Sequence, residues 1–187
     1  MRYRSTKTFG HDLGLSSAFR QWRADSHCRL IHGYALAIHL EFAADELDVR
    51  NWVVDFGSLK SLKQWFADTF DHKLLVAEDD PMRSELAHLE RLGLAEVVMV
   101  PATGCEAFAQ LIYESTEVWL KDNGYAPRVQ LVKVEVREHG ANSAIYQPDA
   151  DDRMSYSDTS QVQLDLDQIE RRVTSSADIQ QALNPTK

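Results

Sequence analysis

Hydrophobic and polar positions alternate strictly between residues 34 and 42. Large apolar side chains occupy every second position from Tyr34 to Phe42, and residues such as His39 and Glu41 fill the positions between them. This period of two predicts a β-strand with one buried face.

Four further segments carry strand patterns. They are LGLSSAFRQW (13–22), NWVVDF (51–56), AEVVMVP (95–101) and VQLVKVEVRE (129–138). In the last of these, Val132, Val134 and Val136 share one face, and Glu138 continues the same face. A carboxylate on an apolar face needs a partner, because an unpaired buried charge is costly.

Three segments have the apolar spacing of amphipathic helices. The first follows Ser58, a predicted N-cap, and the second starts at Pro81 and ends at Gly93. The third follows TGCE, which fits a capping box formed by Thr103 and Glu106. The expected buried residues of the three helices are Leu59, Leu62, Trp65, Phe66 and Phe70; Met82, Leu86 and Leu89; and Phe108, Leu111, Ile112, Ser115 and Trp119.

The order of these elements predicts an α+β fold, with the helices on one face of an antiparallel sheet. After Pro148 the composition becomes polar. We therefore expect one folded domain over residues 1–147 and a polar C-terminal extension over residues 148–187, which packs weakly or mediates assembly.

Composition narrows the class of protein. The 187 residues are 44% hydrophobic and 26% charged, and no apolar run approaches the roughly 20 residues of a membrane span. The N-terminus does not resemble a secretory signal, and the two cysteines are expected to be free thiols, so we expect a cytoplasmic protein. A net charge of −9 argues against a nucleic-acid partner but leaves room for a local anion-binding pocket.

Cys28 and His32 stand four positions apart at the start of the predicted strand. A thiolate is a strong base, and neutral imidazole is a common zinc ligand, so the pair is a candidate catalytic or metal-binding site. The alternative is a half-buried cysteine beside a histidine that bonds the backbone.

Asp71 and His72 follow the predicted end of a helix, where a helix dipole favours an imidazolium. The carboxylate could orient the ring for proton transfer, or the histidine could simply cap the helix on the surface. Glu138 could serve as a structural acceptor, or it could bind a ligand with two adjacent N–H donors, as in an aminopyrimidinone ring.

Five segments resemble, in order and spacing, the 6-pyruvoyl-tetrahydropterin synthase and 6-carboxytetrahydropterin synthase family. They are CRLIHGY, VVDFGSLK, FDHKLL, PATGCEAFAQLIY and VEVREHGANSAIY, and the resemblance covers residues 10–147. It implies the tunnelling fold, a four-stranded antiparallel sheet with two main helices on one face. It also implies homo-oligomers, usually hexamers made of two trimers, whose subunits close a barrel with the sites between them.

The resemblance also implies roles for individual residues. It assigns the base to Cys28, the proton relay to Asp71 and His72, and the pterin anchor to Glu138. The substrate-binding candidates are Glu138, Thr103 and Glu106, although the capping box already explains Glu106.

The family holds a zinc ion with three histidines, and here only His32 matches. Phe19 and Tyr34 stand in the other two positions. His11 and His39 are out of reach by strand geometry, which leaves His27 and His139 as candidates for a rebuilt site. Zinc is therefore doubtful in this chain.

Two functions follow from the resemblance. The first is a lyase of the pterin synthase type, acting on 7,8-dihydroneopterin triphosphate or a related pterin. The second is a zinc-less, non-catalytic protein that binds a pterin or purine. The retained Cys28, Asp71 and His72 favour the first, and Phe19 and Tyr34 favour the second.

Overall fold

The computed structural model describes residues 1–149, which hold seven strands, three α-helices and two short 3-10 helices. The strands are β1 (Tyr3–Phe9), β2 (Leu15–Phe19), β3 (His32–Ala44), β4 (Lys73–Ala77), β5 (Glu96–Val100), β6 (Val129–His139) and β7 (Asn142–Tyr146). The helices are α1 (Lys60–Phe70), α2 (Arg83–Arg91), α3 (Cys105–Asp122), η1 (His11–Leu13) and η2 (His27–Arg29). The extension expected over residues 148–187 lies almost wholly outside the described residues.

The central strand is β3, whose period-two pattern was the clearest strand signal in the sequence. Its first half pairs with β2 and its second half pairs with β1, both antiparallel and along the same edge. Its other edge pairs with β6, which in turn pairs with β7. The antiparallel sheet predicted from the sequence is therefore confirmed for these strands.

The complete sheet is mixed rather than purely antiparallel, and this corrects the expected four-stranded sheet. β4 runs parallel to β2, and β5 runs parallel to β4, which extends the sheet order to β5-β4-β2-β3-β6-β7. The sequence KLLVA of β4 has no period of two, because both of its faces are covered. An apolar run without alternation gave no strand signal here.

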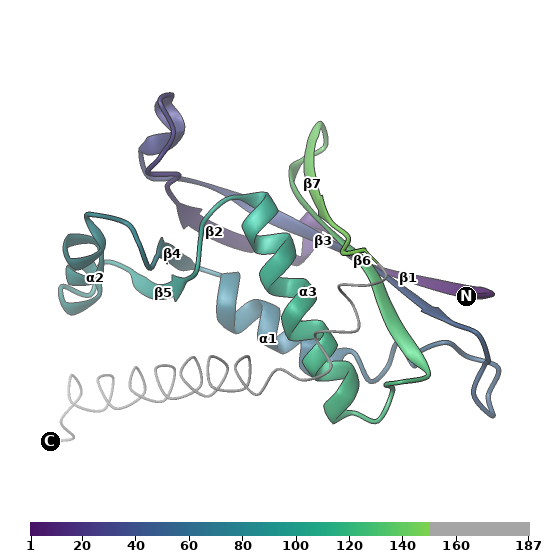
Figure 1. Cartoon of the computed structure of the whole chain (residues 1–187). Coiled ribbons are helices and arrows are strands. Elements are labelled where there is room, and N and C mark those ends of the chain that lie inside the picture. Colours follow the sequence, from purple (N-terminus) through teal and green to yellow (C-terminus); the bar gives the residue numbers. More distant parts are fainter. Residues whose placement is uncertain (150–187) are drawn as a thin grey trace, which may run out of the picture. The chain divides into compact units, whose positions relative to one another are not determined.

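Three α-helices, rather than two on one face, cover the sheet. α1 and α3 pack side by side over the face that carries Leu36, Ile38 and Leu40 of β3 (Figure 1). α2 covers the opposite face of the β4–β5 extension, where Leu86 meets Leu74 and Val76 in a separate apolar cluster. None of the helices in this part of the chain has the length and apolarity needed to cross a membrane.

The N-termini of two helices, α1 and α3, differ from the expectation. α1 begins at Lys60 after Leu59, while the Ser58 hydroxyl bonds the Asp55 carbonyl oxygen and the Tyr125 hydroxyl. α3 begins at Cys105 after Gly104, so the predicted capping box is wrong.

The start of α2 and the segment NWVVDF also differ from the expectation. α2 begins at Arg83, two residues after Pro81. NWVVDF forms no strand, because Val53 and Val54 enter the core from a turn-rich loop.

Candidate active site

Pairing of β2 with β3 brings together the three positions that the resemblance assigns to zinc. Phe19 lies opposite His32, and Ser17 lies opposite Tyr34, so all these side chains share one face of the sheet. The ring centroids of Phe19 and His32 are 5.1 Å apart, and those of His32 and Tyr34 are 5.8 Å apart. The three positions therefore form one group in space.

One of the three side chains offers a metal-binding nitrogen. Nδ1 of His32 lies 2.7 Å from the carbonyl oxygen of Leu30, so this nitrogen donates to the backbone and Nε2 is left as the acceptor. Phe19 is fully buried and packs edge-on against Phe108 of α3. Within residues 1–149, no three His, Cys, Asp or Glu side chains are arranged to hold a metal ion.

Neighbouring groups change the pKa of the Tyr34 phenol. The negative charge of Glu138 raises the pKa of Tyr34, and burial and the nearby Cys28 and Cys105 raise it further. The phenol is therefore neutral at physiological pH and can donate a hydrogen bond. The charges that act on this phenol belong to three other elements, η2, α3 and β6, and we call Tyr34, Cys28, Cys105 and Glu138 the site cluster.

Cys28 belongs to the short helix η2, at the end of the loop that joins β2 to β3. The hydroxyl of Ser26 accepts a bond of 3.3 Å from the Cys28 backbone nitrogen, and the Cys28 carbonyl accepts from the Gln21 nitrogen at 3.0 Å. The residue is half-buried. Its backbone is thus fixed on both sides while its thiol remains partly accessible.

Glu138 enters the cluster from β6. The register of β6 on β3 pairs Val136 with Ile38, and Glu138 follows two residues later, at a β-bulge between Arg137 and His139. It is half-buried, as expected for the end of an apolar face. The thiol of Cys105 is the neighbour of this carboxylate, whose charge helps to raise the pKa of the thiol.

Cys105 is a site residue that the sequence did not reveal. It is the first residue of α3 and is 6% exposed. Burial raises the pKa of its thiol to about 12, and the charges of Glu138 and Glu106 act in the same direction. A single cysteine at a helix start has no sequence signal of its own, because only the packing of α3 on β6 brings it to Glu138.

Asp71 and His72 lie at the C-terminus of α1, as predicted. Asp71 is the C-cap, His72 has a left-handed backbone with a φ of 57°, and their side chains are 2.7 Å apart. The Ser16 nitrogen donates to Asp71 at 3.3 Å, which holds the pair beside the first half of β2. The His72 side chain is 83% exposed.

The structure does not gather Asp71 and His72 into the site cluster. They lie beside Ser16, whereas the loop that carries Cys28 leaves β2 after Phe19. Three strand residues correspond to about 10 Å, so the pair is separated along β2 from the start of the Cys28 loop, although Tyr34 itself pairs with Ser17, next to Ser16.

Thr103 and Glu106 flank the start of α3. The Thr103 hydroxyl donates to the carbonyl oxygen of Arg20 at 2.6 Å, so it is engaged within the protein. Glu106 is exposed in the first turn of α3 and acts on Cys105 through its charge.

His27 and His139 were the candidates for rebuilding a metal site. The His139 ring lies 6.1 Å from the Tyr34 ring, at the rim of the site cluster. His27 begins η2 next to Cys28. Neither residue completes a group of three metal ligands within the described range.

Comparisons with known proteins relate the chain to one family. The model of the 6-pyruvoyl tetrahydropterin synthase family matches residues 11–149. The 6-carboxy-5,6,7,8-tetrahydropterin synthase of Aquifex aeolicus is 25% identical over 159 residues, covering 78% of this chain and 98% of that protein. The enzyme of the same name from Bacillus subtilis is 28% identical over 138 residues, covering 73% and 82%.

Solved structures show the same fold. An uncharacterized protein from Wolinella succinogenes superposes with a TM-score of 0.67 at 20% identity, covering 79% of this chain and 98% of that one. A catalytic-residue mutant of the 6-pyruvoyltetrahydropterin synthase of Plasmodium vivax superposes with a TM-score of 0.57 at 14% identity, covering 79% and 99%.

Proposed function

The chain belongs to the 6-pyruvoyl tetrahydropterin synthase family, and on that basis we propose that it is a cytoplasmic pterin synthase-like lyase. Its substrate is 7,8-dihydroneopterin triphosphate or a related pterin. The observation that carries the proposal is the site cluster, in which a partly accessible thiol and a half-buried carboxylate converge on one neutral phenol.

Glu138 is the proposed anchor for the pterin ring. An ionised carboxylate has two acceptor oxygens, which match the adjacent N–H donors on the aminopyrimidinone edge. The neighbouring Cys105 thiol is a single weak donor, so acceptor capacity remains on the carboxylate. A ligand bound here would lie within reach of the other members of the site cluster.

Cys28 is the proposed base. Its thiolate would take a proton from the pterin side chain, next to the carbonyl that develops during the reaction. Tyr34 donates a hydrogen bond to an oxygen of that side chain, because its raised pKa keeps the phenol protonated.

Asp71 and His72 are the proposed relay. Because the pair is exposed and is separated along β2 from the loop of Cys28, it would act on the Cys28 of a neighbouring copy of the chain. The candidates Thr103 and Glu106 have weaker support. Thr103 uses its hydroxyl on Arg20, and Glu106 is more exposed than Glu138.

The family uses zinc, and we propose that the residues at that place in this chain do not fit it. A catalytic zinc site takes three protein ligands, whereas His32 is the one ligand among His32, Phe19 and Tyr34. No step is therefore assigned to a metal. A neutral phenol stabilises developing charge less than a dication does, so slower turnover is expected than with a complete site.

The aromatic replacements also favour a second function, a non-catalytic protein that binds a pterin or purine. Phe19, His32 and Tyr34 pack as tilted or edge-to-face rings where three imidazoles would surround a metal. This function keeps the Glu138 anchor and dispenses with the base.

Assembly into a homo-oligomeric barrel, based on trimers and possibly a hexamer, is part of the proposal. The sheet face opposite α1 and α3 is lined with paired charges, where Glu41 bonds Arg4 and Lys133. Such a face suits a water-filled lumen better than a dry interface. Among residues 1–149, β1 and β7 each pair with one other strand, and a ring of subunits would pair their outer edges.

Turnover of 7,8-dihydroneopterin triphosphate by the purified full chain tests the proposal, with Cys28→Ala as the matched variant. A lyase releases triphosphate, and Cys28→Ala loses that activity while still retaining a fluorescent pterin. Pterin retention without turnover in either protein supports the binding function. If neither protein binds a pterin, both functions are wrong.

A further inference from the structure

The loop of residues 20–31, which carries Cys28, is fixed at its start by a buried ion pair. Nε and Nη2 of Arg20 donate to the two carboxylate oxygens of Asp80 at 2.7 and 2.9 Å. The Asp80 side chain is 1% exposed. Two parallel bonds fix the plane of the guanidinium as well as its position.

Asp80 is itself held in place by the turn between β4 and α2. Its carboxylate accepts a bond of 2.8 Å from the backbone nitrogen of Met82, and its backbone nitrogen donates to the Ala77 carbonyl at 3.0 Å. The anchor of the loop is therefore a hydrogen-bonded turn that directly follows β4.

Contacts next to Arg20 connect this anchor to the thiol. The Arg20 carbonyl accepts from the Thr103 hydroxyl at 2.6 Å, and the next residue, Gln21, donates its backbone nitrogen to the Cys28 carbonyl at 3.0 Å. The Gln21 side chain also packs on Gly104, where an added Cβ would lie 2.6 Å from Nε2. The start of the loop is thus held between the β4–α2 turn and the first residues of α3.

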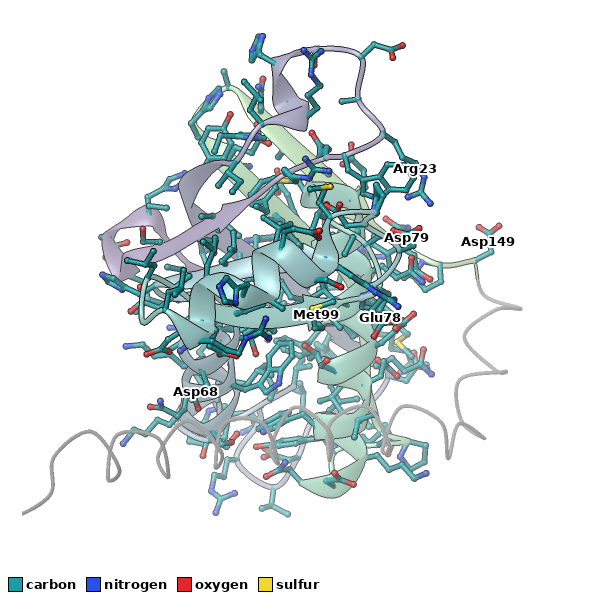
Figure 2. All side chains as sticks on the ribbon, turned by 90° about the vertical axis from the view of Figure 1, so that its left-hand side faces the viewer. Arg23, Asp68, Glu78, Asp79, Met99 and Asp149 are labelled. Carbon is teal, nitrogen blue, oxygen red and sulfur yellow. The ribbon has the colours of Figure 1, made fainter. Side chains whose placement is uncertain are left out.

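Asp79, the residue before Asp80, contacts the next residues of the same loop, and these contacts lie at the surface. Asp79 accepts a bond of 3.0 Å from Nε1 of Trp22 and pairs with Arg23, whose guanidinium lies over the Trp22 ring. Figure 2 shows Arg23 and Asp79 close together at the surface, and their side chains are 63% and 46% exposed. Exposed pairs of this kind contribute little to stability.

We propose that Asp80 is a positioning residue for Cys28. Its carboxylate fixes Arg20 and Gln21, and through the Gln21–Cys28 backbone bond it sets where the thiol lies relative to Tyr34 and Glu138. The catalytic meaning of this position rests on the proposed function, whereas the fixation itself does not. Loss of the pair leaves Arg20 unpaired in a partly buried place, and the loop then opens more often.

Alkylation of Cys28 by iodoacetamide in the full chain measures the fixation without any pterin. The variants are Asp80→Asn and its neighbour Asp79→Asn, which is the matched control because its contacts with Trp22 and Arg23 are exposed. Peptide mass mapping separates Cys28 from Cys105, and circular dichroism identifies the temperatures at which each variant is folded. Arg20→Lys is the second variant, since it keeps the charge but cannot form the two-point bond.

Labelling of Cys28 in folded Asp80→Asn or Arg20→Lys is expected to be about fivefold faster than in the wild type, or more, because the loop opens more often. Asp79→Asn is expected to stay within about twofold of the wild type. Unchanged or slower labelling in both folded test variants would overturn the proposal, even if their melting temperatures fall.

Turnover gives a separate readout that a merely structural role would not produce. If the wild type turns over a pterin, Asp80→Asn lowers kcat and leaves KM nearly unchanged, because the ring is bound by Glu138 and the thiol is misplaced. If the wild type has no activity, the proposed lyase function fails while the labelling result for Asp80 stands.

Discussion

The carboxylate of Glu138 lies beside the thiol of Cys105, the first residue of α3, and its negative charge helps to raise the pKa of that thiol. The contact joins the end of β6 to the start of a helix more than thirty residues earlier in the chain. Its consequence is that the thiol is kept protonated.

The two cysteines are expected to differ in reactivity. With a pKa of about 12, the Cys105 thiol is ionised at pH 8 in only about one molecule in 10⁴. Iodoacetamide should therefore label Cys28 and spare Cys105 in the native protein, as followed by mass spectrometry. Labelling in urea, where both thiols should react, is the control, and equal native labelling would contradict the assigned burial.

Replacement of Glu138 should weaken pterin binding. Glu138→Gln removes a charged acceptor, and hydrogen bonds to charged groups contribute about 1.5–3 kcal/mol, which corresponds to about a 10- to 150-fold loss of affinity. Fluorescence titration with a pterin measures this loss. Glu106→Gln is the matched control and should change affinity much less; a larger loss with Glu106→Gln would move the anchor to that residue.

Histidines at the two aromatic positions should create a zinc site. The variant Phe19→His with Tyr34→His places two new imidazoles beside His32, on side chains that already share one face of the sheet. Metal analysis after dialysis should then find zinc bound in proportion to protein, and the wild type should bind far less. Stoichiometric zinc in the wild type would instead show that other residues complete the site.

Stability should fall in acid partly through Glu41. Burial acts to raise the pKa of its carboxyl, but hydrogen bonds from Arg4 and Lys133 outweigh burial and lower it from the ordinary value of 4.5. A folded pKa below the unfolded one contributes stability that is complete above pH 4.5 and is lost as the pH falls through the folded pKa.

Melting temperatures measured from neutral pH down to pH 3 test this contribution. Glu41→Gln should melt lower than the wild type at neutral pH, and the difference should shrink as the pH falls below 4.5. A difference that is constant over the whole range would show that Glu41 acts through packing and not through its charge.

Patterns local in the sequence were reliable where the two faces of an element differ in polarity. The alternation in β3 and the apolar stripe of α1 gave elements of the correct type, and the parity of β6 placed Glu138 on the core-facing side. The position of Asp71 and His72 at a helix end was also predicted correctly.

Sequence patterns failed to predict a strand whose two faces are both covered. They also failed where a local motif competes with tertiary contacts. β4 was missed because it lies between two apolar clusters and shows no alternation. The capping box failed because the Thr103 hydroxyl bonds Arg20, a partner more than eighty positions away.

The sequence by itself determined the family, the antiparallel centre of the sheet and the residue types available for chemistry. These depend on periodicity and on the order of motifs, and both are properties of the sequence alone. Tertiary structure alone decided that Cys105 contacts Glu138, that Phe19 is buried beside His32, and that Asp80 holds the loop of Cys28. Each of these depends on packing between elements distant in sequence, which fixes burial and charge neighbours that no local pattern encodes.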